Sequence, residues 1–201
     1  MGNNNPNSLK FALTVGIGAF FAAVFFSFFS EIVFPRLQML ILSLTFLILI
    51  ILVGIIFDMI GVAVAVSDDK AFHAKAAKKI RGAGHSLMMV RNADKVATLC
   101  NDVVGDICGT VSGALGVTII IQVAAGRPTF SESFLSMIMT GFVAALTVGG
   151  KAAGKRKAME DSEKIVFMVG KILAWFEHSL GLRLLGNSRR KGKERKKWAK
   201  G

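Results

Sequence analysis

The sequence predicts an all-α, polytopic membrane protein with four transmembrane helices, juxtamembrane helices and a C-terminal amphipathic belt helix. Two observations lead to this fold class. First, 53% of the 201 residues are hydrophobic and the mean hydropathy is +0.56, yet the formal net charge is +12. Second, the apolar and the basic residues occupy different segments, which is typical of a membrane protein with basic flanks. A soluble domain of this length rarely combines the two properties.

Four apolar stretches are long enough to cross the hydrocarbon layer, which takes about 20 helical residues. The first stretch is preceded by a single lysine and followed by no A-x-A cleavage site, so we interpret it as an uncleaved span rather than a signal peptide. Together with the three later stretches it forms a membrane domain over residues 11–150. We expect the spans at about 11–29, 37–66, 101–125 and 134–150.

The distribution of Lys and Arg predicts the orientation of these spans. Seven of these residues fall in the segment 67–100 and fifteen from residue 151 onward, whereas the two remaining turns contribute only Arg36 and Arg127. Positive residues are retained on the cytoplasmic side of a membrane. Four spans with both termini in the cytoplasm satisfy every segment. We therefore expect a multi-pass protein of the plasma or inner membrane.

The segments outside the spans are also patterned. Residues 67–100 are predicted to form a cytoplasmic helical loop, in which GAG at 82–84 separates two short helices. In the segment 151–186 apolar residues recur at helical spacing, but charged residues interrupt them, so we expect an amphipathic interfacial helix rather than a fifth span. Residues 1–10 are expected to be a cytoplasmic N-terminus, and 187–201 a disordered basic tail.

The basic tail is predicted to contact anionic lipid, because each Lys or Arg near such a surface contributes about 1 kcal/mol. Nucleic-acid binding is not expected, since no aromatic platform or known binding fold accompanies the charge. The residues expected to contact lipid are Arg189, Arg190, Lys191, Lys196 and Lys197.

One face of the third span combines small and acidic residues. On an ideal helix Asp102, Asp106 and four glycines project within one arc of about 100°. The opposite side is apolar. Small residues let helices approach closely in membranes. We expect this face to pack against another helix, within the chain or across a homodimer, and the apolar side to meet lipid. The expected packing residues are Gly105, Gly109 and Gly113, and the expected lipid-facing residues are Val104, Ile107, Val111 and Leu115.

The acids of the spans require a partner, because a carboxylate inside a bilayer costs at least ~2.5 kcal/mol on insertion scales. Asp58 shares a small-residue face of the second span with Gly54 and Gly61, at a depth similar to that of Asp106. The predicted spans contain no Lys or Arg to pair with these acids. A hard cation or a shared proton is then the expected partner, and oxygen ligands favour Na⁺ or Mg²⁺ over soft metals.

Several short stretches follow one another in a familiar order. AVAVS ends at Ser67, HAKAAKKIRGA follows, Asn101 opens the next span, and GGKAAGKRKAMEDSEKI contains Lys151. In this order, residues 50–186 resemble the transmembrane domain of the CorC/cyclin-M family, which is linked to magnesium and cobalt efflux. The resemblance implies membrane helices and cation transport. Ser67 and Asn101 join Asp58, Asp102 and Asp106 as candidate metal ligands.

The chain departs from that family at defined positions. The Glu of the family motif corresponds to Thr147, its Pro to Gly150, and an acid of the earlier span to Val62. The nucleotide-binding regulatory domains that usually follow are not found in these 201 residues. The chain is therefore predicted to be a divergent relative.

Two functions stay open at this point. The first is binding or transport of a hard cation of the Mg²⁺ or Na⁺ class. The second is a non-transporting membrane module that recruits partners or anionic lipid through its basic tail. An enzyme is not expected, since the sequence offers no nucleophile–base pair. The expected partners are the lipid bilayer and a second copy in a homodimer, and no nucleic acid.

Overall fold

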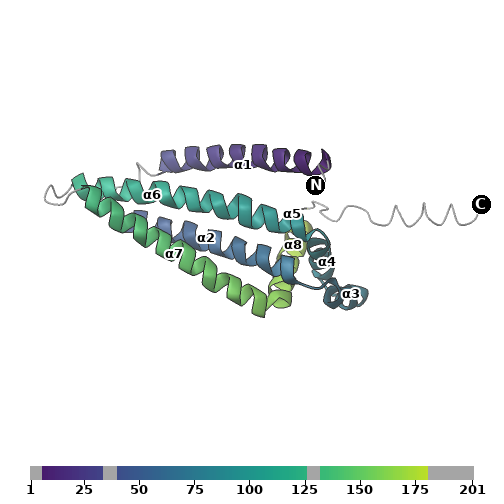
Figure 1. Ribbon diagram of the computed structural model, residues 1–201. Helices are drawn as coiled ribbons and strands as arrows, with labels where there is room; N and C mark the ends of the chain where they lie inside the picture. Colours follow the sequence, from purple (N-terminus) through teal and green to yellow (C-terminus); the bar gives the residue numbers. More distant parts are fainter. Residues whose placement is uncertain (1–5, 34–39, 126–131, 181–201) are drawn as a thin grey trace, which may run out of the picture.

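The computed structural model describes residues 6–33, 40–125 and 132–180. These residues form helices joined by short turns, and no strand occurs among them. Figure 1 shows the long helices α1, α2, α6 and α7 running side by side, with the shorter α3, α4 and α8 gathered at one end. The all-α class predicted from the sequence is confirmed for this part of the chain.

Three helices are long and apolar enough to cross a membrane. They are α2 (Leu40–Val66), the continuous helix from Ala93 to Val123, and α7 (Glu132–Glu160) from Ser133 onward. The first helix, α1 (Pro6–Val33), contains a shorter apolar stretch, Ala12–Phe28. The structure thus supports a membrane protein with three candidate spans, and the span expected at 11–29 stays a prediction.

The core of the long bundle lies where α2 meets α6 (Asp106–Ala125) and α7. Apolar side chains of the three helices form one buried cluster, and this packing removes from solvent the stripe of α6 that we expected to face lipid. That expectation is wrong for three of the four residues, because α2 and α7 cover them. The cluster consists of Leu47, Ile51, Ile107, Val111, Leu115, Ile119 and Val143.

The span expected at 101–125 begins earlier than predicted. A short helix, α5 (Ala93–Ala97), continues into a π-helical stretch, η2 (Thr98–Gly105), and then into α6 without a break. Residues 93–100 therefore belong to the same continuous helix as the predicted span and not to a separate loop. No proline interrupts the segment, and its alanines, leucine and lysine favour helix, so nothing stops the helix at the expected boundary.

The span expected at 134–150 ends later than predicted. We expected it to stop at Gly150, but α7 continues to Glu160. Alanine, lysine and arginine dominate the added turns, and these are strong helix formers that offset the one glycine, Gly154. The predicted interfacial helix over 151–186 is therefore divided: its first ten residues extend α7, and α8 covers Ser162–Leu180.

The turn between α7 and α8 is centred on Asp161. Its backbone carbonyl accepts from the amides of Lys164 and Ile165, 3.0 and 3.1 Å away. Its carboxylate pairs with Lys157 of α7 and accepts from Lys164 Nζ of α8 at 2.7 Å. These two ammonium groups hold the pKa of Asp161 down at about 2, so the carboxylate stays charged at neutral pH.

The two short helices predicted after α2 are α3 (Asp69–Ala77) and α4 (Ala83–Arg91). They are separated at Gly82, which has a φ of +90° and lies just before α4. Their apolar side chains pack with α8 and the end of α2 in a second cluster, formed by Ala63, Val64, Phe72, Met89, Ala158 and Val166. The predicted break in the loop is therefore observed.

Helix α8 is docked on α4 through a close backbone approach. Ser86 of α4 is fully buried, and its hydroxyl lies 3.1 Å from the carbonyls of Val166 and Gly82. Nearby, His85 Nε2 lies 2.5 Å from Glu177 Oε2, and both side chains are largely buried. Ile165, Phe167, Val169 and Leu173 pack against the second cluster. Four large apolar residues of α8 are exposed, namely Met168, Ile172, Trp175 and Phe176. This helix is therefore amphipathic, with one docked face and one exposed apolar face.

Candidate cation site at the end of the apolar band

Ionisable side chains begin at a common level in the three long helices. Such residues are missing from 40–57 in α2, 107–125 in α6 and 133–150 in α7. Each run has about 18 residues, or roughly 27 Å of helix, which is close to the thickness of a bilayer's hydrocarbon core. The first ionisable residues beyond these runs are Asp58, Asp106 and Lys151, toward the end of the bundle that carries α3, α4 and α8 (Figure 1).

Asp58 is the most deeply buried acid at this level. Only 3% of its surface is exposed, because it lies on the same buried face of α2 as Gly54 and Gly61. The burial expected for this residue is observed. Its Oδ2 atom lies 3.5 Å from the Nζ atom of Lys155, whose side chain is 48% exposed. The predicted spans contain no Lys or Arg, but α7 continues beyond the predicted end at residue 150 and brings Lys155 beside this acid.

A second lysine of α7 reaches the same place. A Cβ atom added to the buried Gly105 would lie 3.4 Å from Lys151 Nζ and 4.0 Å from Asp58 Oδ1. Because Gly105 has no side chain, the Asp58 carboxylate and the Lys151 ammonium can both lie close to the end of η2. The close packing expected of Gly105 is found within the chain.

Asn101 faces α2 from the middle of η2. A Cβ atom added to Gly61 would lie only 2.0 Å from Asn101 Oδ1, so the amide sits directly against that glycine. Asn101 Oδ1 and Asp58 Oδ2 are both buried, and within the described residues neither accepts a hydrogen bond. Buried oxygens are normally satisfied. Asp58 and Gly61 are one turn apart, so α2 and η2 place two unsatisfied acceptors within a single turn of helix.

A π-helical stretch, η2, lies at the start of this face. A π-turn contains more residues than an α-turn and is frequent at functional sites. The acids Asp102 and Asp106 still share one side of the helix, as projected, but the core uses the opposite stripe of α6, so this side is outward. Asn101 and Gly105 point toward α2, whereas Asp102 and Asp106 are exposed.

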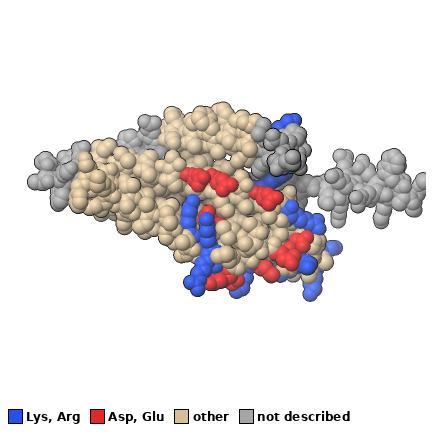
Figure 2. Space-filling view, in the orientation of Figure 1, with Lys and Arg blue, Asp and Glu red and all other residues tan. Residues whose placement is uncertain are grey.

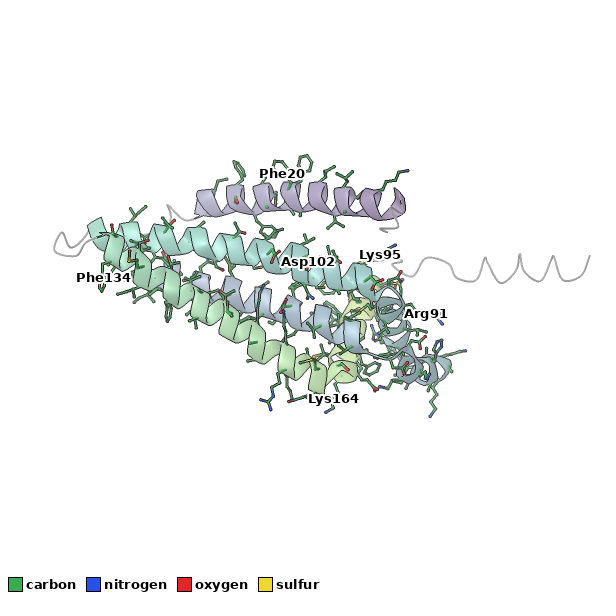
Figure 3. All side chains as sticks on the ribbon, viewed as in Figure 1. Phe20, Arg91, Lys95, Asp102, Phe134 and Lys164 are labelled. Carbon is green, nitrogen blue, oxygen red and sulfur yellow. The ribbon has the colours of Figure 1, made fainter. Side chains whose placement is uncertain are left out.

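The outward direction of these two acids corrects the predicted ligand set. Figure 3 labels Asp102 on the helix that leads into α6, and the space-filling view shows acidic atoms at mid-length of this face with basic side chains close by (Figure 2). Asp102 and Asp106 do not share the buried position of Asp58. Ser67 also lies away from Asp58, just after the end of α2 at Val66. Its hydroxyl donates to the Ala63 carbonyl at 2.7 Å.

Two of the three glycines expected to pack have free space around them. A Cβ atom added to Gly109 or Gly113 would meet no atom of the described chain within 4 Å. The prediction that these two glycines pack inside the chain is therefore wrong, because the core is formed by the opposite stripe of α6. Packing across a homodimer stays a prediction. The predicted lipid contacts Arg189, Arg190, Lys191, Lys196 and Lys197 lie outside the described residues.

The chemistry of the site favours a hard cation. Its acceptors are a carboxylate and an amide oxygen, which are ligand types for Na⁺, Mg²⁺ or Ca²⁺. Within the described residues no group of three His, Cys, Asp or Glu side chains that could hold a metal ion occurs, so Asp58 is the single carboxylate of this candidate donor set. Asp58 and Asn101 would hold the ion, while Lys151 and Lys155 compete for the same carboxylate. The sequence interpretation missed both lysines because it ended the fourth span too early.

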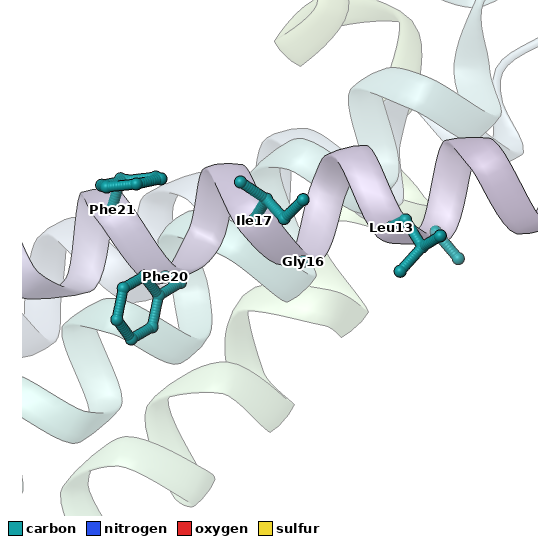
Figure 4. Close-up of a pocket in the computed structure, with 6 residues that line it drawn as sticks. Leu13, Gly16, Ile17, Phe20 and Phe21 are labelled. Carbon is teal, nitrogen blue, oxygen red and sulfur yellow. The ribbon is translucent and has the colours of Figure 1, made fainter.

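The hollows elsewhere are apolar. One lies along α1, and Figure 4 shows its lining side chains, which carry no ionisable or hydrogen-bonding group. It is lined by Ala12, Leu13, Gly16, Ile17, Phe20 and Phe21. A second lies between α1 and the bundle, with Phe26, Phe46 and Val103 among its lining residues. Both suit acyl chains better than an ion.

No family model matches this chain, and neither the curated proteins nor the solved structures that were compared with it include a match. The similarity to the CorC/cyclin-M membrane domain therefore continues to rest on the order of its short motifs.

Proposed function

We propose that this protein is an integral membrane protein that binds a hard cation, of the Na⁺ or Mg²⁺ class, between α2 and η2, as a step in its transport. The observation that supports this most is the pair of buried oxygens, Asp58 Oδ2 and Asn101 Oδ1, that accept no hydrogen bond from the described residues. Leaving such a group unsatisfied costs about 1–3 kcal/mol, and more when it is charged. A bound cation would satisfy both oxygens at once.

The proposed placement puts the apolar runs of α2, α6 and α7 in the bilayer. Positive residues cluster at the end that carries α3, α4 and α8, so this end faces the cytoplasm. The exposed apolar face of α8, with Trp175 and Phe176, then lies in the interface as a belt, as amphipathic helices with exposed aromatic residues do. In this placement Asp58 lies near the cytoplasmic boundary, where an ion can reach it without crossing the whole hydrocarbon layer.

The arrangement of helices agrees with what the family resemblance implies. Two short helices follow α2, a long helix opens near Asn101, and α8 folds back after α7. This order supports transport by a CorC/cyclin-M-like mechanism. Asp58 supplies an acid one turn before Val62, the position at which the family's acid is replaced here.

The orientation is tested by cysteine labelling in intact cells. Ala77 ends α3 and Ser133 is the second residue of α7, and both are exposed. We expect an impermeant maleimide to label Ser133→Cys from outside and Ala77→Cys only after the cells are opened. The parent chain, which retains Cys100 and Cys108, gives the background signal. External labelling of Ala77→Cys would contradict the proposed topology.

The cation site is tested by thermal unfolding of the purified protein. Mg²⁺ and Na⁺ are titrated against choline chloride at constant ionic strength, because a ligand that binds only the folded state raises its stability by about 2.7 kcal/mol at 100 times its Kd. We expect one of these ions to raise the Tm of the wild type, and Asp58→Asn to abolish the rise. Asp106→Asn removes the same charge from an exposed position and should retain it.

Two results would refute the site. One is a wild-type Tm that neither Mg²⁺ nor Na⁺ raises above the choline control. The other is a rise of equal size in the wild type and in Asp58→Asn, which would place the bound ion elsewhere.

A further inference from the structure

We infer that Lys155 is a tethered competitor of the cation: its ammonium occupies the Asp58 carboxylate when no ion is bound, and it must leave for the ion to bind. This inference rests on the proposed cation site and concerns how that site is controlled. It starts from one contact, the 3.5 Å ion pair between Lys155 Nζ and Asp58 Oδ2.

The two partners of this ion pair differ in freedom. The Asp58 side chain is 4% exposed and is fixed on the inner face of α2, whereas the Lys155 side chain is 48% exposed on α7. A lysine carries its charge on a flexible four-carbon stem and is strongly hydrated. Lys155 can therefore turn its ammonium into water, but Asp58 cannot follow it.

The contact itself is loose. Although the ammonium lies 3.5 Å from Oδ2, that oxygen accepts no hydrogen bond from the described residues. Charge-assisted bonds between a cationic N–H and a carboxylate are usually about 2.7–2.9 Å long. Lys155 thus balances the charge of Asp58 without satisfying the oxygen. A small cation can do both, provided that the ammonium moves away.

The neighbouring residues support an exchange rather than a permanent pair. Within the described residues Lys155 is the one side chain that forms an ion pair with Asp58. The Lys151 ammonium and the Asp58 carboxylate also both lie close to Gly105. A buried ion pair repays the loss of hydration only when its geometry is good and further hydrogen bonds satisfy both partners. Here the basic partner is half exposed. The cost of displacing it must lower the apparent affinity of the site for a cation.

The test compares three variants in the thermal titration described above. Lys155→Gln removes the competing charge and keeps most of the side chain's length. Lys155→Arg keeps the charge. Arg156→Gln is the matched control, because it removes a positive charge one residue away from a side chain that is 83% exposed and pairs with Glu160.

We expect Lys155→Gln to lower the half-maximal cation concentration about tenfold or more, with Lys155→Arg near the wild type. Arg156→Gln should change it less than twofold, since exposed charges are screened over about 10 Å at 0.1 M salt. In the wild type the cation should also increase acetylation of Lys155 by an amine-reactive ester, measured by mass spectrometry against Lys164, which is 82% exposed.

The outcomes separate this inference from the proposed function. If the cation stabilises neither the wild type nor any variant, the cation site itself is refuted. If the wild type is stabilised but Lys155→Gln has the same or a higher half-maximal concentration, the site stands and Lys155 is not a competitor. Unchanged acetylation of Lys155 at saturating cation would overturn the inference in the same way.

Discussion

Replacing Gly170 by alanine is expected to detach α8 from α4 and to lower the free energy of unfolding by about 3 kcal/mol, the upper part of the range for overpacking. The added Cβ would lie 2.1 Å from Ser86 Oγ and 2.7 Å from the Gly82 carbonyl oxygen. The hydroxyl can rotate, but the carbonyl belongs to a backbone held at a φ of +90° and cannot retreat. Denaturant unfolding of the purified protein measures the change.

The control for this substitution is Gly109→Ala. Both changes add one methyl group to a helix, but nothing lies within 4 Å of the Cβ position at Gly109. Alanine favours helix over glycine by up to about 1 kcal/mol, so Gly109→Ala should be neutral or stabilising. Trypsin should also cut Gly170→Ala faster at Lys157 and Lys164, which flank the Asp161 turn. Equal stability of the two variants would show that α8 does not depend on this contact.

The fold could be predicted from the sequence wherever hydrophobicity alone determines the structure. The length of α2 and the separation of α3 from α4 at Gly82 followed from an apolar run and a glycine-rich break. The ends of α5 and α7 could not be predicted in this way. Both helices continue through alanine- and lysine-rich turns, and in such turns charge density indicates where the apolar band ends and not where the helix ends.

The candidate site was predictable in half of its parts for a related reason. Asp58 lies between glycines on a regular α-helix, so its burial followed from helical geometry. Asp106 does share a side of the helix with Gly109 and Gly113, as the same geometry predicts, but the core uses the opposite stripe of α6 and leaves this side outward. Lys155 was missed because a lysine beyond the apolar run is expected to face water. Its contact with Asp58 arises from the way α7 packs on α2, which no local pattern records.

A strong effect on the cation site, without any change to its two ligand side chains, is expected from Gly61→Ala. The added Cβ would lie 2.0 Å from Asn101 Oδ1, 2.6 Å from its Cγ and 3.0 Å from its Nδ2. All three atoms are at the end of a side chain that can rotate, so the fold should lose no more than about 1 kcal/mol. The amide oxygen, however, must leave its position against Gly61, one helical turn from Asp58. We expect the half-maximal cation concentration in the thermal titration to rise at least tenfold.

Asn101→Leu and Gly113→Ala complete this comparison. Asn101→Leu removes the oxygen with a similar side-chain volume, so it should weaken cation binding at least as much as Gly61→Ala while relieving a buried unsatisfied acceptor. Gly113→Ala adds the same methyl group to open space and should bind like the wild type. If Asn101→Leu raises stability without cation but reduces the stabilisation that cation gives, the unsatisfied oxygen is retained for binding. If Gly61→Ala and Asn101→Leu both bind like the wild type, Asp58 holds the ion without Asn101.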